Sequence, residues 1–95
     1  MKRVVIESPF AGDVEANVAY LRRAILDCLA RGEAPYASHR FFPGILDDDN
    51  QEQRRLGMDA GFAWSAVAEL VAVYADRGIS QGMQQGIARA TALGI

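Results

Sequence analysis

The sequence predicts a small three-layer α/β domain, Rossmann-like in outline, with helices on both faces of a short parallel sheet of three or four strands. Apolar runs of strand length alternate with longer segments in which apolar residues recur at helical spacing. The run at residues 70–74 is continuously apolar and rich in strand formers, which is typical of a parallel strand buried on both faces. Ser80 follows as a good N-cap, so a helix is expected to open just after this strand.

The first half of the chain reads as a βαβ unit. Residues 4–6 form the first predicted strand, which ends at Ser8 and Pro9. Asp13 is the expected N-cap of a helix that Gly32 terminates. Cys28 lies on the apolar side of that helix and is predicted to belong to the core. A weak second strand is expected at residues 34–38, because a right-handed crossover needs a parallel strand beside the first.

The second half repeats the pattern after a loop at residues 39–50. Asp49 is predicted to cap a helix that runs to about residue 68, with Glu52 completing a capping box. Gly57 and Gly61 are expected to allow close packing on that helix. The last helix is predicted at residues 81–93. The dipeptide that follows it leaves three interpretations open: a three-stranded sheet, a shortened sequence, or an edge strand supplied by a partner.

The composition argues against several classes of protein. The 95 residues form one predicted domain, residues 1–95, and the net charge of −2 gives no general attraction to nucleic acid or to anionic membranes. No run approaches the roughly 18 apolar residues of a membrane span. The single cysteine excludes an internal disulfide and fits a cytoplasmic protein. His39 has no second His or Cys near it, and residues 47–49 read as a solvated acidic turn more readily than as a Mg²⁺ site, so we expect no metal or other cofactor.

The predicted binding site lies where the carboxyl ends of the strands meet, because ligands of open α/β sheets bind at that edge. Ser80 and the amides near Gly82 could hold an anion at the start of the last helix. Phe10 could stack on a base, His39 or Arg40 could contact a phosphate, and Asp76 could accept a hydrogen bond from a ribose hydroxyl. Each residue also has a purely structural interpretation as a helix cap, a core residue or a surface residue.

Three segments resemble motifs of the nucleoside 2-deoxyribosyltransferase-like superfamily, which includes the 2′-deoxynucleoside 5′-phosphate N-hydrolases. They are Val4-Val5-Ile6-Glu7-Ser8-Pro9-Phe10, Ala34-Pro35-Tyr36-Ala37-Ser38-His39 and Ile79-Ser80-Gln81-Gly82-Met83-Gln84-Gln85-Gly86. The chain looks closest to a small branch of phage and bacterial proteins of unknown function. The resemblance implies a nucleotide or nucleoside bound over the sheet edge, with a closing Glu of the third motif that attacks C1′ of the sugar.

At the place of that nucleophile the sequence has Gly86. The binding features of the superfamily carry over, and the nucleophile does not. With the loop and edge residues above, the predicted ligand-binding set is Ser8, Pro9, Phe10, Gly12, His39, Asp76, Ser80, Gly82 and Met83.

The leading hypothesis is therefore a non-catalytic domain that binds a nucleotide-type small molecule through an anion at the start of the last helix. The alternative is an N-glycosidase or deoxyribosyltransferase with a relocated carboxylate, for which Asp76 is a weak candidate beside Asp13 and Glu7. A third hypothesis is a structural or interaction module. We also expect a homodimer or higher oligomer, with Phe62 and Trp64 at the subunit contact, since a short sheet leaves two open edges.

Overall fold

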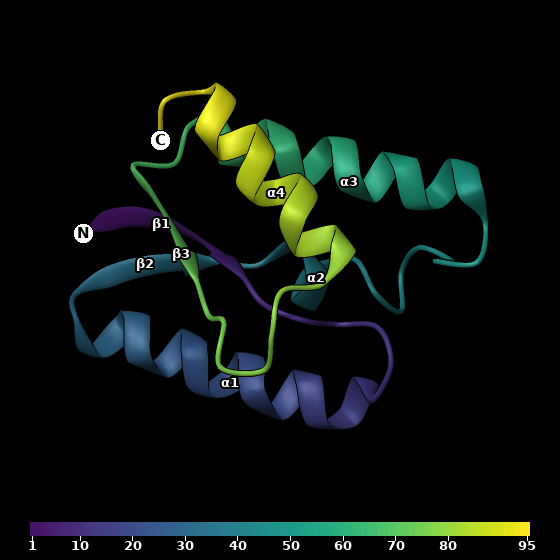
Figure 1. Ribbon diagram of the computed structural model, residues 1–95, viewed down its shortest axis with the longest axis horizontal. Coiled ribbons are helices and arrows are strands. Elements are labelled where there is room, and N and C mark those ends of the chain that lie inside the picture. Colours follow the sequence, from purple (N-terminus) through teal and green to yellow (C-terminus); the bar gives the residue numbers. More distant parts are fainter.

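The computed structural model describes residues 1–95 and confirms the predicted three-layer α/β architecture. Three parallel strands in the order β2-β1-β3 form the sheet, with α1 on one side and α3 and α4 on the other (Figure 1). The elements in chain order are β1 (Lys2–Glu7), α1 (Val14–Ala30), β2 (Glu33–Tyr36), α2 (Ser38–Phe41), α3 (Gln51–Ser65), β3 (Leu70–Val73) and α4 (Gln81–Ala92).

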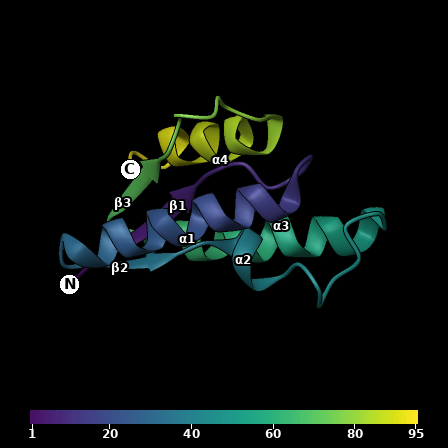
Figure 2. The same ribbon diagram turned by 90° about the horizontal axis from the view of Figure 1, so that it is seen from below.

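The side chains of the central strand β1 alternate between the two faces of the sheet, because successive residues of a strand point in opposite directions. Val4 and Ile6 are each 1% exposed and belong to the core cluster that includes Leu21 and Cys28 of α1. The prediction that Cys28 is a core residue is thus confirmed. Glu7, three residues after Val4, belongs to the opposite face, on which α3 and α4 lie. Figure 2 shows β1 between its two neighbours.

Two strand predictions were wrong in detail. Residues 70–74 were expected to be buried on both faces, yet Leu70 and Val73 are 39% and 40% exposed. The reason is that β3 is an edge strand with β1 as its single neighbour. The second strand ends at Tyr36 rather than at residue 38, and the expected loop at 39–50 contains most of the short helix α2.

Side-chain caps fix the helix starts. Asp13 accepts a hydrogen bond from the Ala16 amide and Ser80 accepts one from the Met83 amide, as predicted. The cap of α3 is Asn50 and not Asp49, because the Asn50 side chain accepts from the Gln53 amide. α3 also ends at Ser65, three residues before its predicted end, and α4 ends at Ala92, one residue before.

The two glycines of α3 bring this helix against the segment between β2 and α3, as predicted. A methyl group at Gly61 would lie 3.1 Å from the Ser38 side chain, and one at Gly57 would lie 3.3 Å from Leu46. α3 is thereby held close to α2 and the loop after it, which together form one wall of a cleft. None of the helices has the length and hydropathy that a bilayer-spanning segment needs.

Candidate functional site

A cleft of about 360 Å³ opens at the carboxyl ends of β1 and β2. One wall is formed by α3 with the segment before it, and the other by the loop after β1 and the first half of α4. Aromatic side chains contribute much of the apolar lining, among them Phe10, Tyr36, Phe42 and Phe62. This size and mixture of apolar and polar groups are those of a site for a small organic molecule.

The carboxyl group of Glu7 lies inside the cleft, at the last residue of β1. Burial raises the pKa of Glu7 to about 7, and no hydrogen bond or neighbouring charge from the protein offsets this effect. The Glu7 oxygens are not among the fully buried polar atoms that lack a partner, so water in the cleft can reach them. A ligand that donates a hydrogen bond to Glu7 would replace this water, because no donor from the protein lies on the carboxyl group.

Gly86 of α4 makes room for this carboxyl group. A methyl group added at Gly86 would lie within 2.8 Å of Cδ, Oε1 and Oε2 of Glu7. The Glu7 carboxylate thus occupies the space into which a side chain at position 86 would project. The residue at which the resemblance expects a nucleophile is a glycine, and an acid on the facing strand takes up the vacated volume.

Ser8 and His39 form a hydrogen-bonded pair beside Glu7. The Ser8 hydroxyl and His39 Nε2 are 2.6 Å apart, and Ser8 is 5% exposed. Burial lowers the pKa of His39 to about 4, so the imidazole is neutral at physiological pH. A neutral imidazole adds no positive charge to the cleft. The pair fixes the loop after β1 to the start of α2.

The start of α4 is less open to an anion than the sequence predicts. The Met83 amide donates to Ser80 Oγ at 3.2 Å, and the Ser80 amide donates to Met83 Sδ at 3.4 Å. These two contacts leave the amides of Gln81 and Gly82 as the donors of the first turn. Met83 is 1% exposed, so its main role is in the core.

The loop that carries Phe10 is held by Asn17 of α1. The Asn17 side-chain amide donates to the carbonyl oxygens of Phe10 and Ala11, each at 3.0 Å. We expect Asn17→Ala to destabilise the protein by about 1–2 kcal/mol, since it removes two partly buried hydrogen bonds. Urea denaturation measures this change, and an unchanged free energy of unfolding would contradict it. Val18→Ala, one residue along the same helix, is a control for lost apolar burial.

The structure brings together six of the nine predicted binding residues around the cleft. These six are Ser8, Phe10, His39, Ser80, Gly82 and Met83. Pro9, Gly12 and Asp76 do not line it, and Arg40 and Asp13 also lie outside. No three His, Cys, Asp or Glu side chains converge as the ligands of a metal ion would.

Sequence reasoning missed several groups that line the cleft, namely Tyr36, Asp48, Gln53 and Arg54. Tyr36 stood within the predicted second strand and was given no role. Asp48 was part of the predicted acidic turn. Tyr36 is the last residue of β2, Asp48 lies in the loop before α3, and Gln53 and Arg54 lie in the first turn of α3. The signal that could have found them is a position at or near the end of an element.

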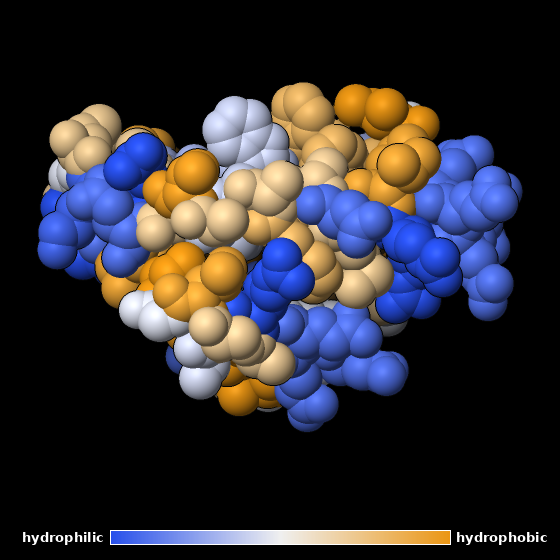
Figure 3. Space-filling view, turned by 90° about the horizontal axis from the view of Figure 1, so that it is seen from above, coloured by the Kyte–Doolittle hydropathy of each residue, from blue (hydrophilic) through white to orange (hydrophobic).

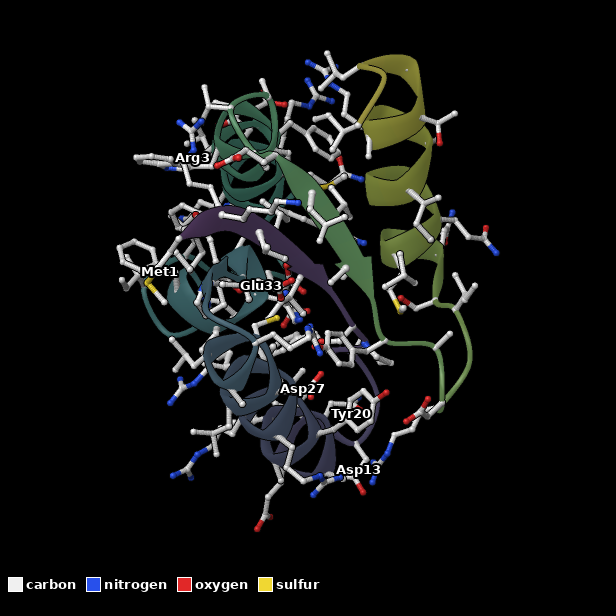
Figure 4. The ribbon with its side chains drawn as sticks, turned by 90° about the vertical axis from the view of Figure 1, so that its left-hand side faces the viewer. Met1, Arg3, Asp13, Tyr20, Asp27 and Glu33 are labelled. Atoms are coloured by element: carbon white, nitrogen blue, oxygen red, sulfur yellow. The ribbon has the colours of Figure 1, made fainter.

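A second polar cluster lies on the α1 side of the sheet. The Tyr74 hydroxyl is 2.8 Å from Asp27 Oδ2, 3.0 Å from an Arg31 nitrogen and 3.3 Å from Cys28 Sγ. Arg31 also pairs with Glu33 at 2.9 Å, and Figure 4 shows Asp27 and Glu33 at this end of α1. These side chains satisfy one another, so the cluster ties the segment after β3 to α1 and is structural.

Comparison with known proteins places the chain in a family. The family described as "Domain of unknown function (DUF7768)" matches residues 2–95. The chain belongs to the DUF7768 family. No curated protein matches the sequence. Among solved structures, the DUF7768 fold is similar to a 2-deoxyribosyltransferase from the psychrotolerant bacterium Bacillus psychrosaccharolyticus, with a TM-score of 0.77 and 13% identity.

That similarity covers 97% of the DUF7768 chain and 66% of the transferase, so this chain spans slightly less than two thirds of the transferase's length. At 13% identity the likeness concerns the fold. It confirms the predicted nucleoside 2-deoxyribosyltransferase-like architecture, and the match to a family of unknown function fits the predicted branch.

Proposed function

We propose that the cleft binds a nucleoside-type small molecule whose sugar hydroxyls donate hydrogen bonds to Glu7. The observation that carries this proposal is the Glu7 carboxyl group, which lies in the cleft without a protein partner. A sugar hydroxyl supplies the missing donor, and the aromatic lining suits a flat base. The fold shared with a 2-deoxyribosyltransferase supports this class of ligand.

The position of a phosphate is a separate part of the proposal. The amides of Gln81 and Gly82 could receive the 5′ oxygen or 5′ phosphate of the ligand. However, Arg77, the basic residue nearest in sequence to this helix start, lies over the Tyr20 ring at 5.1 Å from its centroid. With weak positive charge at this end and Glu7 nearby, the cleft favours an uncharged nucleoside over its monophosphate.

Isothermal titration calorimetry against nucleosides, deoxynucleosides and their 5′-monophosphates tests the proposal. We expect a nucleoside to bind with a dissociation constant below 1 mM, and Glu7→Gln to weaken it about tenfold. Glu15→Gln, an exposed acid in the first turn of α1, is the matched control and should bind as the wild type does. Absence of submillimolar binding across the panel would contradict the proposal and favour an interaction module.

A second candidate function is cleavage or transfer at the N-glycosidic bond, with Glu7 as the attacking group. It is favoured by one observation, the overlap of the Glu7 carboxylate with the space beside Gly86. A carboxylate oxygen would bond to C1′ while the C1′–N bond breaks and its electron pair leaves with the base, which takes a proton from water. Water or a second base would then attack C1′ and release Glu7.

Chromatography of free base after incubation with deoxynucleosides separates this function from binding alone. If Glu7 attacks C1′, base release falls about 10³-fold or more in Glu7→Gln. In the wild type it rises with pH and levels off above about pH 7, because the ionised carboxylate is the nucleophile. Binding without base release in the wild type would assign the protein to the non-catalytic class.

We further propose that the chain self-associates through exposed apolar residues at the end of α3. Trp64 and Val67 are 58% and 51% exposed, and the Trp64 ring lies 5.8 Å from that of Tyr36. Phe62, the other candidate, lines the cleft and lies beneath Arg89, so Trp64 is the better one. Light scattering after size-exclusion chromatography should give a dimer mass that falls to a monomer mass in Trp64→Lys, and a monomeric wild type would contradict this.

A further inference from the structure

Three polar side chains lie together where α3 begins: Asp48, Gln53 and Arg54. We call them the polar rim. All three line the cleft. Gln53 Oε1 accepts a hydrogen bond from the Asp47 amide at 2.7 Å, which holds the acidic turn against the first turn of α3. The rim is thus built from two segments that are fixed to each other.

Apart from Gln53 Oε1, the side-chain donors and acceptors of the rim have no hydrogen-bond partner in the protein. The bond from Asp47 occupies Gln53 Oε1 and orients the Gln53 NH₂ group, whose two hydrogens are left to donate. The ion pairs of the protein are formed by Arg3 and Arg31, so neither Asp48 nor Arg54 is engaged in one. The rim therefore offers one carboxylate acceptor beside one amide donor and one guanidinium donor.

The rim and Glu7 belong to different ends of the same cleft. Glu7 is at the end of β1 in the middle of the molecule, whereas α3 begins at the far end of the long axis (Figure 1). Figure 3 shows hydrophilic residues gathered at that end of the α3–α4 face. The lining of the cleft also includes the apolar side chains of Phe42, Leu46 and Met58. If the sugar lies against Glu7, the base extends toward the rim.

We propose that the polar rim selects guanine as the base of the bound nucleoside, an inference that rests on the proposed nucleoside-binding function. Guanine carries two adjacent donors, N1–H and N2–H, that pair with a single carboxylate, here Asp48. Its adjacent acceptors, O6 and N7, match the paired donors of an arginine, here Arg54. The Gln53 NH₂ group supplies a further donor to this acceptor edge.

The other bases satisfy the rim less completely. Adenine and cytosine each present one exocyclic amino group to Asp48 and leave its second oxygen without a donor. Thymine presents a single N3–H between two carbonyl oxygens, which face the carboxylate unfavourably. Asp48 and Arg54 are exposed, so water solvates whichever of their groups a base leaves unpaired. The preference for guanine therefore follows from the number of hydrogen bonds that it forms with the rim.

Calorimetry with a series of purine analogues on the full chain tests the assignment. We expect 2′-deoxyguanosine to bind about tenfold or more tightly than 2′-deoxyadenosine, 2′-deoxycytidine and thymidine. 2′-Deoxyinosine, which lacks the N2 amino group, should lose about tenfold in the wild type and nothing further in Asp48→Asn. 7-Deaza-2′-deoxyguanosine, which lacks N7, should likewise bind about tenfold more weakly to the wild type and lose nothing further in Arg54→Gln.

Neighbouring residues provide matched controls. Asp49→Asn and Arg55→Gln change the same charges one residue away, at positions that do not line the cleft, and should keep the guanine preference. Equal affinities for all four deoxynucleosides, or a preference that survives both rim substitutions, would overturn the base assignment while nucleoside binding stands. Absence of binding to every nucleoside would overturn both proposals.

Discussion

Moving the carboxylate from strand to helix, by combining Glu7→Gly with Gly86→Glu, is expected to restore the ligand binding that each single substitution loses. Glu7→Gly removes the unpaired acid from the cleft. Gly86→Glu alone places a second side chain in volume that Glu7 fills, since even a methyl group there overlaps the carboxylate. Two carboxylates in one site also repel each other.

The size of the effect makes the comparison decisive. Each single variant should weaken nucleoside binding about tenfold or more, and the double variant should lie within about threefold of the wild type. If the wild type releases base, the same ordering is expected for its rate. Circular dichroism of the three variants confirms that they are folded. A double variant as weak as the singles would show that the position of the backbone, rather than of the carboxylate, governs binding.

The second large effect is a dependence of stability on pH that Glu7→Gln removes. The pKa of Glu7 is raised to about 7 in the fold, from 4.5. Between pH 4.5 and 7 the folded state therefore binds more protons than the unfolded state, and stability falls as pH rises. Glutamine has no charge to bury. Glu7→Gln should match the wild type below pH 4.5 and exceed its stability by about 2 kcal/mol at pH 8.

His39 has the opposite effect on the pH dependence of stability, over an overlapping pH range. Its pKa is lowered to about 4 from 6.5, so the unfolded state binds more protons and stability rises with pH between these values. In the wild type the two trends offset each other between pH 4.5 and 6.5. Glu7→Gln should expose the rising trend and His39→Gln the falling one. Urea denaturation from pH 4 to pH 8 measures both, and identical profiles for wild type and Glu7→Gln would refute the buried state of Glu7.

Much of the fold follows from short-range patterns. The caps Asp13 and Ser80 are next to the helices they start, and the core position of Cys28 follows from helical periodicity. The cap of α3 was misplaced by one residue because Asp49 and Asn50 are both good N-caps. Only the side-chain geometry selects Asn50.

The candidate site was predictable in part. The sheet edge collected six of the predicted residues because the carboxyl ends of parallel strands meet there. The contact between Glu7 and Gly86 was not predictable from the sequence, since 79 positions separate the two residues. Only the packing of α4 over the end of β1 brings them together. The sequence shows an acid at a strand end and a glycine where an acid was expected. It does not show that these two residues are in contact.

The fit between these two residues has an evolutionary consequence. With Glu7 in its observed position, a side chain at position 86 would displace the carboxyl group, so a larger residue at 86 favours a smaller one at 7. Aligned homologues should therefore show the two columns covarying.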